Sequence, residues 1–397
     1  MATYKEQNKL NVPHLRFPEF HGEWEKCKLG DIATLTKGSG ISKDQRSATG
    51  TPCILYGELY TTYKSEVIDY VVSKTDISDK NLVRSCANDI IIPSSGETAI
   101  DISTARCVLS PDVLLGGDLN IIRLKDGDGR FFSYQLNGVR KHDIAKIAQG
   151  VSVVHLYGES IKGLTVSFPS NKEQQKISTL LSLIDERIAT QSKLIEDLKK
   201  LKSAIIEIEY TRNTKTTSPI GDVIEQISKR NKNNAIQNVL SVSNRQGFIK
   251  QSDQFENRNV ASEDTSNYKI VEQNDFAFNP ARINVGSIAR LTTFEKGIVS
   301  PMYVCFRTQE NVAPEYIDYF FESKHFYCEI QKRLEGSVRQ CLSFEGLCNI
   351  PLSLPSFEIQ QRIGKRIFTL RQKIKMETDL LELLNKQKQY LLRQMFI

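Results

Sequence analysis

The stretch Pro169-Ser-Asn-Lys-Glu-Gln-Gln-Lys-Ile177 occurs a second time, in modified form, as Pro355-Ser-Phe-Glu-Ile-Gln-Gln-Arg-Ile363. Both copies combine a Pro-Ser pair with a Gln-Gln pair at the same spacing. Proline disfavours a helical residue before it, and serine is a preferred N-cap, so each stretch predicts the start of a helix. In the first copy, Ser170 and Glu173 also have the spacing of a capping box.

The similarity extends beyond these helix starts. The interval from Pro169 to Pro355 also carries Asn88-Asp89 onto Asn274-Asp275, and a slightly shifted interval carries Leu-Gly-Asp-Ile at 29–32 onto Ile-Gly-Asp-Val at 220–223. Self-similarity at a fixed period indicates a repeated architecture. The chain is therefore predicted to be a duplicated unit of about 190 residues, each copy being a globular block followed by a long helix.

The two predicted helices carry apolar residues in alternating steps of four and three. These residues are Ile177, Leu181, Ile184, Ile188, Ile195, Leu198 and Ile205 in the first helix, and Ile363, Ile367, Leu370, Ile374, Leu381, Leu384 and Leu391 in the second. The spacing is the heptad period of coiled coils. Five to six heptads extend for roughly 60 Å at 1.5 Å per residue, which is longer than such a block is wide. We therefore expect the helices to pack against each other, although each could instead pack on its own domain.

Connectivity predicts the direction of the pair. Only about eight polar residues separate the first helix from the second block, so the simplest arrangement is two antiparallel helices related by a pseudo-twofold axis. The predicted fold class is α+β, with a first domain at 1–170, a central spacer helix at 171–212, a second domain at 213–355 and a C-terminal spacer helix at 356–397. Within the domains, short β-branched runs such as 67–72 alternate with turn residues, and helices are expected at 130–140 and 315–334.

Composition excludes several classes of protein. The 397 residues are 40% hydrophobic and 25% charged, which is ordinary for a globular chain. The sequence contains no signal-like or membrane-spanning apolar run, so a cytoplasmic protein is expected. Its eight cysteines form no Cys-x-x-Cys pair and its five histidines no metal-binding pair, so no metal is expected. The net charge of +6 belongs to the two helices, since 356–397 carries +5 and 171–212 carries +1, and bulk charge does not establish nucleic-acid binding by the domains.

Catalytic motifs are missing from the sequence. The glycines at 38–40 lack the spacing of a phosphate-binding loop. Phe278-Asn-Pro-Ala281 is similar to the tetrapeptide of DNA amino-methyltransferases but lacks its second proline and its aromatic residue. The chain is predicted to be non-catalytic and to hold no cofactor. A methyltransferase remains the catalytic alternative, and it would have to bind S-adenosylmethionine.

These features together resemble the specificity subunit of type I restriction–modification enzymes. The resemblance rests on Arg16-Phe-Pro-Glu-Phe20 with Trp24, on 29–32, and on the doubled helix start. It implies two target recognition domains, each reading one half of a bipartite asymmetric DNA site. It also implies that the helices set the spacing and dock two modification (methyltransferase) subunits. S-adenosylmethionine, ATP and Mg are then expected on the modification subunits and on restriction (translocase) subunits, and no membrane partner is expected.

Candidate DNA-binding residues follow from the chemistry of base edges, where Arg pairs with guanine and Asn or Gln with adenine. The first candidates are the loops after the two Asn-Asp strands, which contain Ser94, Ser95 and Thr98 in the first copy and Arg282 and Asn284 in the second. Further candidates are Lys43, Arg46, Arg230, Lys232, Asn244, Arg245 and Arg339. Each of them could instead be an ordinary solvated surface residue. The alternative function is a coiled-coil assembly scaffold whose globular domains bind protein rather than DNA.

Overall fold

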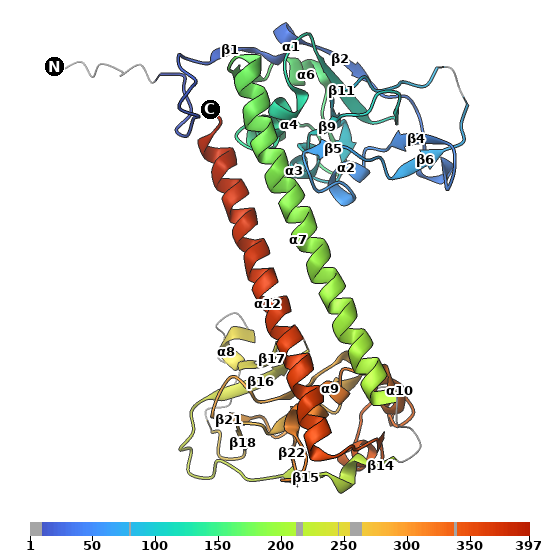
Figure 1. Ribbon diagram of the computed structural model, residues 1–397, viewed down its shortest axis with the longest axis vertical. Coiled ribbons are helices and arrows are strands. Elements are labelled where there is room, and N and C mark those ends of the chain that lie inside the picture. The colour runs from blue at the N-terminus through green and yellow to red at the C-terminus, as the bar shows by residue number, and fades with distance from the viewer. Residues whose placement is uncertain (1–9, 79–80, 212–216, 245, 255–263, 337–339) are drawn as a thin grey trace, which may run out of the picture. The chain divides into compact units, whose positions relative to one another are not determined.

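The structure is a computed structural model that describes residues 10–78, 81–211, 217–244, 246–254, 264–336 and 340–397 (Figure 1). The chain divides into two compact units. Unit 1 contains the residues up to Ser192 together with Asp379–Ile397, and unit 2 contains Lys193–Thr378. Each unit holds one globular domain and part of both long helices, α7 (Asn171–Thr211) and α12 (Phe357–Gln394).

Unit 1 is built around a five-stranded sheet of order β2-β11-β7-β9-β5, in which only the β5–β9 pair is parallel. Its strands are β2 (Ala33–Lys37), β11 (Leu119–Leu124), β7 (Asp89–Pro93), β9 (Arg106–Val108) and β5 (Val67–Ile68). A second sheet contains β10 (Leu114–Leu115), β4 (Thr51–Ile54), β6 (Ser73–Thr75) and β3 (Arg46–Ser47), and two further pairs join β1 (Glu25–Lys28) to β13 (Thr165–Phe168) and β8 (Ser95–Gly96) to β12 (Val154–His155). The short helices are α1 (Leu29–Ile32), η1 (Lys43–Gln45), α2 (Glu58–Thr61), α3 (Ala99–Ile102), α4 (Gly129–Asn137), α5 (Lys141–Ile147) and α6 (Gly158–Lys162).

Unit 2 repeats this plan with a four-stranded sheet of order β15-β22-β19-β20, in which β15, β22 and β19 take the places of β2, β11 and β7. These strands are β15 (Ile224–Ile227), β22 (Val304–Thr308), β19 (Phe276–Phe278) and β20 (Ile288–Arg290). A second sheet contains β17 (Gly247–Lys250), β16 (Val239–Ser243), β21 (Lys296–Val299) and β18 (Lys269–Glu272), and β14 (Ser218–Pro219) pairs with β23 (Pro351–Leu352). The short helices are η2 (Ile220–Asp222), α8 (Gln251–Gln254), η3 (Ile283–Val285), α9 (Pro314–Phe320), α10 (Lys324–Gln331) and α11 (Phe344–Cys348). The α+β prediction and the internal repeat are confirmed.

The repeated Asn-Asp pair lies at the start of β7 and immediately before β19, each of which is an inner strand of the large sheet in its unit. Asn88 and Asn274 both have a positive φ, 77° and 72°, a conformation that asparagine tolerates better than most residues. Asp89 Oδ2 accepts the backbone N–H of Cys86 at 2.7 Å, and Asp275 Oδ2 accepts that of Glu272 at 2.8 Å. The motif is therefore a turn that leads into the strand.

The repeated glycines are required by a close approach of two chain segments. A Cβ on Gly30 would lie 2.9 Å from Cβ of Lys162, and a Cβ on Gly221 would lie 2.7 Å from Cβ of Cys348. Lys162 and Cys348 are themselves separated by the interval of the repeat. The same tight contact is thus present in both domains.

The repeated glutamine fastens each long helix to its domain. Gln174 Oε1 accepts the backbone N–H of Asp128 at 2.9 Å, and its Nε2 donates to Pro169 O at 2.8 Å. Gln360 makes the same two bonds, at 2.9 and 2.8 Å, with Ala313 and Pro355. Asp128 and Ala313 are the N-cap residues of α4 and α9, so the glutamine joins two helix starts in each unit.

Two expectations about local structure were wrong. Glu173 does not serve a capping box but binds Arg16, whose Nε and Nη2 each lie 2.8 Å from a carboxylate oxygen, because a guanidinium fork can engage both oxygens at once. The helix expected at 315–334 is two helices, α9 and α10, because the Ser323 side chain accepts the N–H of Phe326 and begins a new helix.

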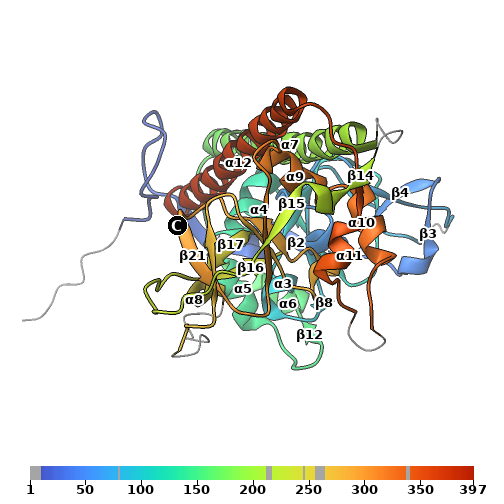
Figure 2. The ribbon, with the colours of Figure 1, turned by 90° about the horizontal axis from the view of Figure 1, so that it is seen from below.

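The heptad residues of both long helices are buried or half-buried, as predicted. In unit 1, Ile177 near the start of α7 shares a core with Leu392 near the end of α12. In unit 2, Ile206 near the end of α7 shares a core with Ile363 near the start of α12, and α9 lies between these helices and the sheet (Figure 2). Because each helix meets the opposite end of the other, α7 and α12 run antiparallel.

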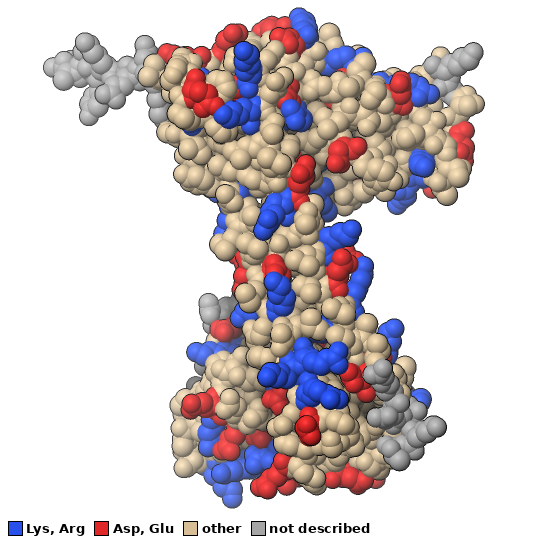
Figure 3. Space-filling view, in the orientation of Figure 1, with Lys and Arg blue, Asp and Glu red and all other residues tan. Residues whose placement is uncertain are grey.

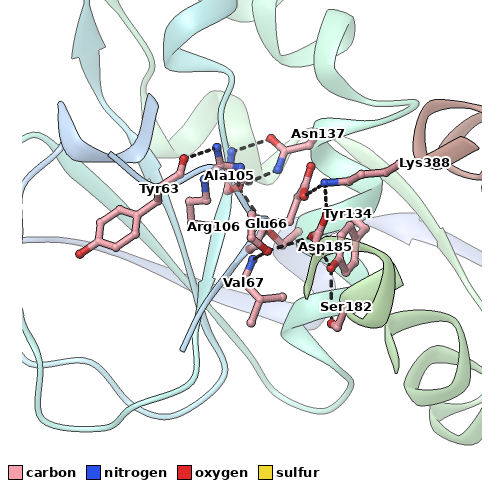
Figure 4. Close-up of polar contacts among 12 residues, drawn as sticks. Tyr63, Glu66, Val67, Ala105, Arg106, Tyr134, Asn137, Ser182, Asp185 and Lys388 are labelled. Atoms are coloured by element: carbon pink, nitrogen blue, oxygen red, sulfur yellow. Dashed lines mark hydrogen bonds and ion pairs between the residues drawn. The ribbon is translucent and has the colours of Figure 1, made fainter. Parts of the chain in front are cut away.

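A buried ion cluster holds the end of α12 in unit 1 (Figure 4). Lys388 Nζ lies 2.5 Å from Oε2 of Glu66 and 2.5 Å from Oδ1 of Asp185, and all three side chains are at most a tenth exposed. The Tyr134 hydroxyl donates to Asp185 Oδ2 at 2.8 Å. Burial raises the pKa of Glu66, whereas for Lys388 burial is outweighed by the two carboxylates, which raise its pKa. Lys388 therefore stays charged and compensates two buried acids.

Candidate nucleic-acid interface

In both domains the candidate residues that follow the middle strand lie at one end of the large sheet. The N–H of Leu156 donates to Ser94 O at 2.9 Å just beyond β7, and the N–H of Leu342 donates to Pro280 O at 3.0 Å just beyond β19. The two donors are separated by the interval of the repeat, and so are the two acceptors. The loops that follow the two strands therefore occupy equivalent positions.

The first domain has an open groove of about 1020 Å³ beside this sheet end. Lys43 and Arg46 line one part of it, and Tyr56 lines another. Asp118 also lines the groove, and its carbonyl accepts the N–H of Ser94 at 2.7 Å. Two of the predicted residues thus lie in a concave surface next to the loop that follows β7.

A buried carboxylate orients Arg46. Arg46 Nη1 lies 3.6 Å from Glu58 Oε1, and Arg46 Nε donates to Lys43 O at 3.3 Å. Glu58 is 6% exposed and is fixed by the N–H of Leu55, 2.9 Å from its Oε2, and by the hydroxyl of Ser73. The Arg46 side chain itself remains 40% exposed. Sequence reasoning missed Glu58, because a single glutamate has no diagnostic spacing.

The serines and the threonine after β7 are part of the fold. Ser94 is buried, and its backbone N–H and carbonyl are both hydrogen-bonded. Ser95 pairs with His155 in the β8–β12 ladder. Thr98 caps α3, since its hydroxyl accepts the N–H of Asp101 at 3.1 Å and donates to the Asp101 carboxylate at 2.6 Å. The structure does not bring these three side chains to the groove.

In the second domain two candidates from different loops come together. Asn244, at the end of β16, and Arg282, before η3, line a small pocket of about 60 Å³ with Tyr303. Asn284 lies within η3 and is half-buried. Arg230 and Lys232 are exposed outside this pocket, and Arg230 Nη1 donates to Asn267 Oδ1 at 2.9 Å. Arg245 and Arg339 lie outside the described residues.

Charge is mixed over the two domains on the face that carries α7 and α12 (Figure 3). Lys and Arg gather there over the first turns of α12. The exposed basic residues of this part of the helix are Arg362, Lys365, Arg366, Arg371, Lys373 and Lys375. Three of them are paired: Arg366 lies 2.9 Å from Glu209, Arg371 lies 3.3 Å from Asp318, and Lys373 contacts Glu377. On this face Lys and Arg therefore form a group on the first part of α12, whereas on the domains they are interspersed with Asp and Glu.

In the described part of the chain, no cluster of three or more His, Cys, Asp or Glu could hold a metal. All eight cysteines are free, and burial raises the pKa of Cys53 to about 11 and that of Cys305 to about 12, so these two thiols remain protonated and weakly nucleophilic at neutral pH. No helix among the described residues has the length and apolar character needed to cross a membrane.

Comparison with known proteins identifies one family. The sequence model of the type I restriction modification DNA specificity domain matches the chain twice, at residues 21–200 and 213–386. Two curated relatives come from Methanocaldococcus jannaschii. The MjaVIII specificity subunit is 23% identical, with 92% of this chain and 90% of the relative covered, and the putative MjaX specificity subunit is 24% identical, with 98% and 94% covered.

Solved structures share the fold. The S subunit of a type I restriction–modification system from M. genitalium superimposes with a TM-score of 0.64 at 17% identity, with 97% of this chain and 99% of that chain covered. A second structure, from a study of the complex assembly and conformational transition of the type I system, gives a TM-score of 0.53 at 13% identity, with 93% and 96% covered.

Proposed function

Because this chain belongs to the type I restriction–modification DNA specificity family and acts as a specificity subunit, we propose that each of its domains reads one half of a bipartite, asymmetric DNA site. The observation that supports the proposal is that both domains are built on the same backbone framework. The same backbone contacts support different loops at equivalent sheet ends, Lys43 and Arg46 beside one and Arg282 and Asn244 at the other. A shared frame with divergent loops suits two readers of different half-sites.

The nature of the exposed side chains supports DNA as the ligand. Arginine pairs with guanine O6 and N7 and asparagine with adenine N6 and N7, and each good bidentate pair is worth about 1–3 kcal/mol of discrimination against the wrong base. Since both domains are nearly neutral, we propose that they supply base contacts while partner subunits supply much of the phosphate contact. In that case the salt dependence of DNA binding becomes steeper when the modification subunits are added.

Domain exchange tests the reading function. Residues 213–355 are replaced by the corresponding block of another specificity subunit, and methylated adenines are mapped genome-wide in cells that express the chimera with its modification subunits. We expect half of the methylated sequence to change and the other half to persist. A chimera that loses its partner subunits while the methylated sequence of the remaining complex is unaltered would instead indicate a scaffold.

The outer faces of the long helices are proposed as the docking surfaces for two modification subunits. In unit 2, Leu194, Leu201 and Ile208 of α7 lie one heptad apart and are 40–48% exposed. In unit 1, Leu383 and Tyr390 of α12 lie one heptad apart and are 61% and 56% exposed. Apolar rows at heptad spacing fit a helical partner, and a structural neighbour comes from a study of complex assembly in a type I system.

Single charges in these rows test the docking. Leu201→Asp and Leu383→Asp are each expected to reduce the number of modification subunits that copurify from two towards one, because a carboxylate cannot be buried in an apolar contact without a partner. Lys199→Asp, at an exposed position outside the rows, is the matched control. Retention of two modification subunits by the double variant would contradict the assignment.

The helices are also proposed to set the number of unread base pairs between the half-sites. Insertion of one heptad into α7 after Ser192 and one into α12 after Thr378, at the borders of the two units, lengthens both helices by about 10 Å. The mapped sites should then gain roughly three unread base pairs at 3.4 Å each. An unchanged spacer would show that the helices do not measure it.

Catalysis is assigned to partner subunits. We propose that the chain itself binds no cofactor, that S-adenosylmethionine belongs to the modification subunits, and that ATP and Mg belong to restriction subunits that join the complex. DNA of the cell is its target, so the cytoplasm is its proposed location. Saturable binding of S-adenosylmethionine to the isolated chain would contradict this division of labour.

A further inference from the structure

A hairpin loop in the first domain exposes two valines beside the candidate interface. The loop is closed by two reciprocal backbone hydrogen bonds between Gln149 and His155, of 2.9 and 2.7 Å. At its tip Val151 is 95% exposed and Val153 is 53% exposed. The two side chains therefore find little cover within the domain.

The backbone of this tip is closely specified. Gly150 has a φ of 116°, and a Cβ there would lie 2.2 Å from the carbonyl oxygen of Val153, so only glycine fits. The second domain has the same closure, since Glu335 and Cys341 exchange hydrogen bonds of 2.9 and 2.8 Å and Gly336 has a φ of 103°. The duplication has kept the same closing hydrogen bonds and the same positive-φ glycine at equivalent places in both domains.

The hairpin stands at the sheet end that carries the groove. His155 pairs with Ser95 in the β8–β12 ladder, and Leu156 donates to Ser94 O. Ser94 in turn donates to the carbonyl of Asp118, which lines the groove. Three consecutive backbone contacts therefore connect the valines to the surface that holds Lys43 and Arg46.

The side chains at the tip of the hairpin indicate which part of DNA it could contact. Residues 149–155 include no lysine or arginine, so the hairpin offers no cation to phosphate. Valine methyl groups at an exposed turn add nothing to the core, where a polar residue would serve equally well. On a base edge, the apolar group that such side chains contact is the C5 methyl of thymine in the major groove.

We propose that this hairpin is a base-contacting element of the first domain and that Val151 packs against a thymine methyl group in its half-site. The proposal rests on the proposed function and deepens it. Val151 acts as a specificity residue through van der Waals contact. Arg46 and Lys43 in the adjacent groove supply hydrogen bonds to neighbouring base pairs.

The experiment uses the full complex with its modification subunits and a duplex carrying the site mapped by methylation. Val151→Ser is expected to weaken binding about fifteenfold, since covering one methyl group is worth roughly a factor of four and two are lost. Because Val151 is 95% exposed, the change has no folding contact to disrupt. Leu109→Ser is the control, since Leu109 is 39% exposed and follows β9 at the opposite end of the sheet.

A second arm removes the ligand's methyl group. Each thymine of the first half-site is replaced in turn by uracil, which lacks the C5 methyl. One replacement is expected to weaken binding by the wild-type complex about fourfold and to have less than a twofold effect on Val151→Ser. An equal loss on thymine and uracil sites, or full binding by Val151→Ser, overturns the inference. If domain exchange still switches half of the methylated sequence in that case, the proposed function stands without it.

Discussion

The first domain has a groove of about 1020 Å³ at its sheet end, whereas the pocket at the equivalent end of the second domain measures about 60 Å³. The contacts beneath these surfaces agree closely, because Gln174 and Gln360 make the same two hydrogen bonds and Leu156 and Leu342 make the same third one. The hydrogen bonds that attach each domain to its helix are therefore the same in both copies, whereas the loops at the sheet ends have diverged. Recognition can diverge without loss of the frame.

The two units also differ in how the equivalent lysines are paired. Lys388 in unit 1 contacts Glu66 and Asp185, and all three side chains are at most a tenth exposed. In unit 2 the equivalent lysine, Lys202, is 19% exposed and lies 2.5 Å from Glu322, which is 31% exposed. Arg371 also lies 3.7 Å from Glu322. One lysine is thus a buried counter-ion, and the other belongs to a hydrated group with a second cation.

The largest expected effect is the difference in stability between variants of these two lysines. Lys388→Met removes the cation that contacts both Glu66 and Asp185 and should lower the free energy of unfolding of unit 1 by about 3–5 kcal/mol. Lys202→Met should cost unit 2 about 1 kcal/mol or less, because water and Arg371 still compensate Glu322. Trp24, the one tryptophan of the chain, lies in the unit 1 core and reports unfolding of that unit in urea. Hydrogen exchange reports unit 2.

Lys386→Met is the control for this pair of variants, since Lys386 forms an exposed i,i+4 pair with Glu382. It should leave both units within about 0.5 kcal/mol of the wild type. Equal costs for Lys388→Met and Lys202→Met would remove the contrast between the two clusters.

The duplicated architecture and the two long helices could be predicted from the sequence, because both depend on residues that recur at regular spacing. The heptads of 177–205 and 363–391 are visible without any tertiary information, and so is the interval that most matched positions of the two copies share. The family assignment followed from the same repeated stretches. Antiparallel packing followed from the short connection between the first helix and the second domain.

The contacts within each domain could not be predicted in the same way. Gln174 and Gln360 were visible as repeats, but their partners, Asp128 and Ala313, lie 46 and 47 residues away in sequence and become neighbours only on folding. The candidate Thr98 is a helix cap, a role that its type allows as readily as DNA contact. The type of residue at a loop position does not show whether its side chain is exposed on the binding surface or used within the fold.

The next prediction concerns the feature that the two units share. Gln174→Ala and Gln360→Ala each leave one buried N–H and one buried carbonyl unpaired, which costs about 2 kcal/mol. The loss should appear in unit 1 for the first variant and in unit 2 for the second, and the two magnitudes should agree within about 0.5 kcal/mol. Gln175→Ala, at the exposed neighbouring position, should have no effect. A loss of stability for only one of the two variants would show that the equivalent hydrogen bonds contribute different free energies.

A smaller effect is expected from the surfaces that differ. Arg46→Ala should weaken binding to the mapped site about tenfold, and this corresponds to about 1.4 kcal/mol, with relaxed methylation specificity in the first half-site only. Arg282→Ala should do the same for the second half-site only. Methylation mapping of each variant reads both half-sites at once, so the untouched half is an internal control. Relaxation of both half-sites by one variant would indicate a loss of folding or of partner binding rather than of readout.

The smallest effect concerns the two matched aspartates, Asp89 at the start of β7 and Asp275 immediately before β19. Asp89 is bound by Arg123 through two hydrogen bonds of 2.8 and 2.7 Å, whereas Arg307 reaches Asp275 with one of 3.1 Å. Burial raises the pKa of Asp275 above its usual 3.8, although Arg307 opposes the shift. The native carboxyl therefore holds its proton more tightly than the unfolded one, and the stability of unit 2 should fall as the pH rises from about 3.8 through the native pKa.

Asp275→Asn should abolish this decline, because an amide does not titrate, and its oxygen can still accept the N–H of Glu272. At pH 7 the variant should change the stability of unit 2 by less than about 0.5 kcal/mol, whereas Asp89→Asn should cost unit 1 about 1 kcal/mol by leaving Arg123 without its counter-charge. Hydrogen exchange between pH 4 and 7 measures both units in each variant. A stability of unit 2 that rises over this range in the wild type would show that Arg307, rather than burial, sets the ionisation of Asp275.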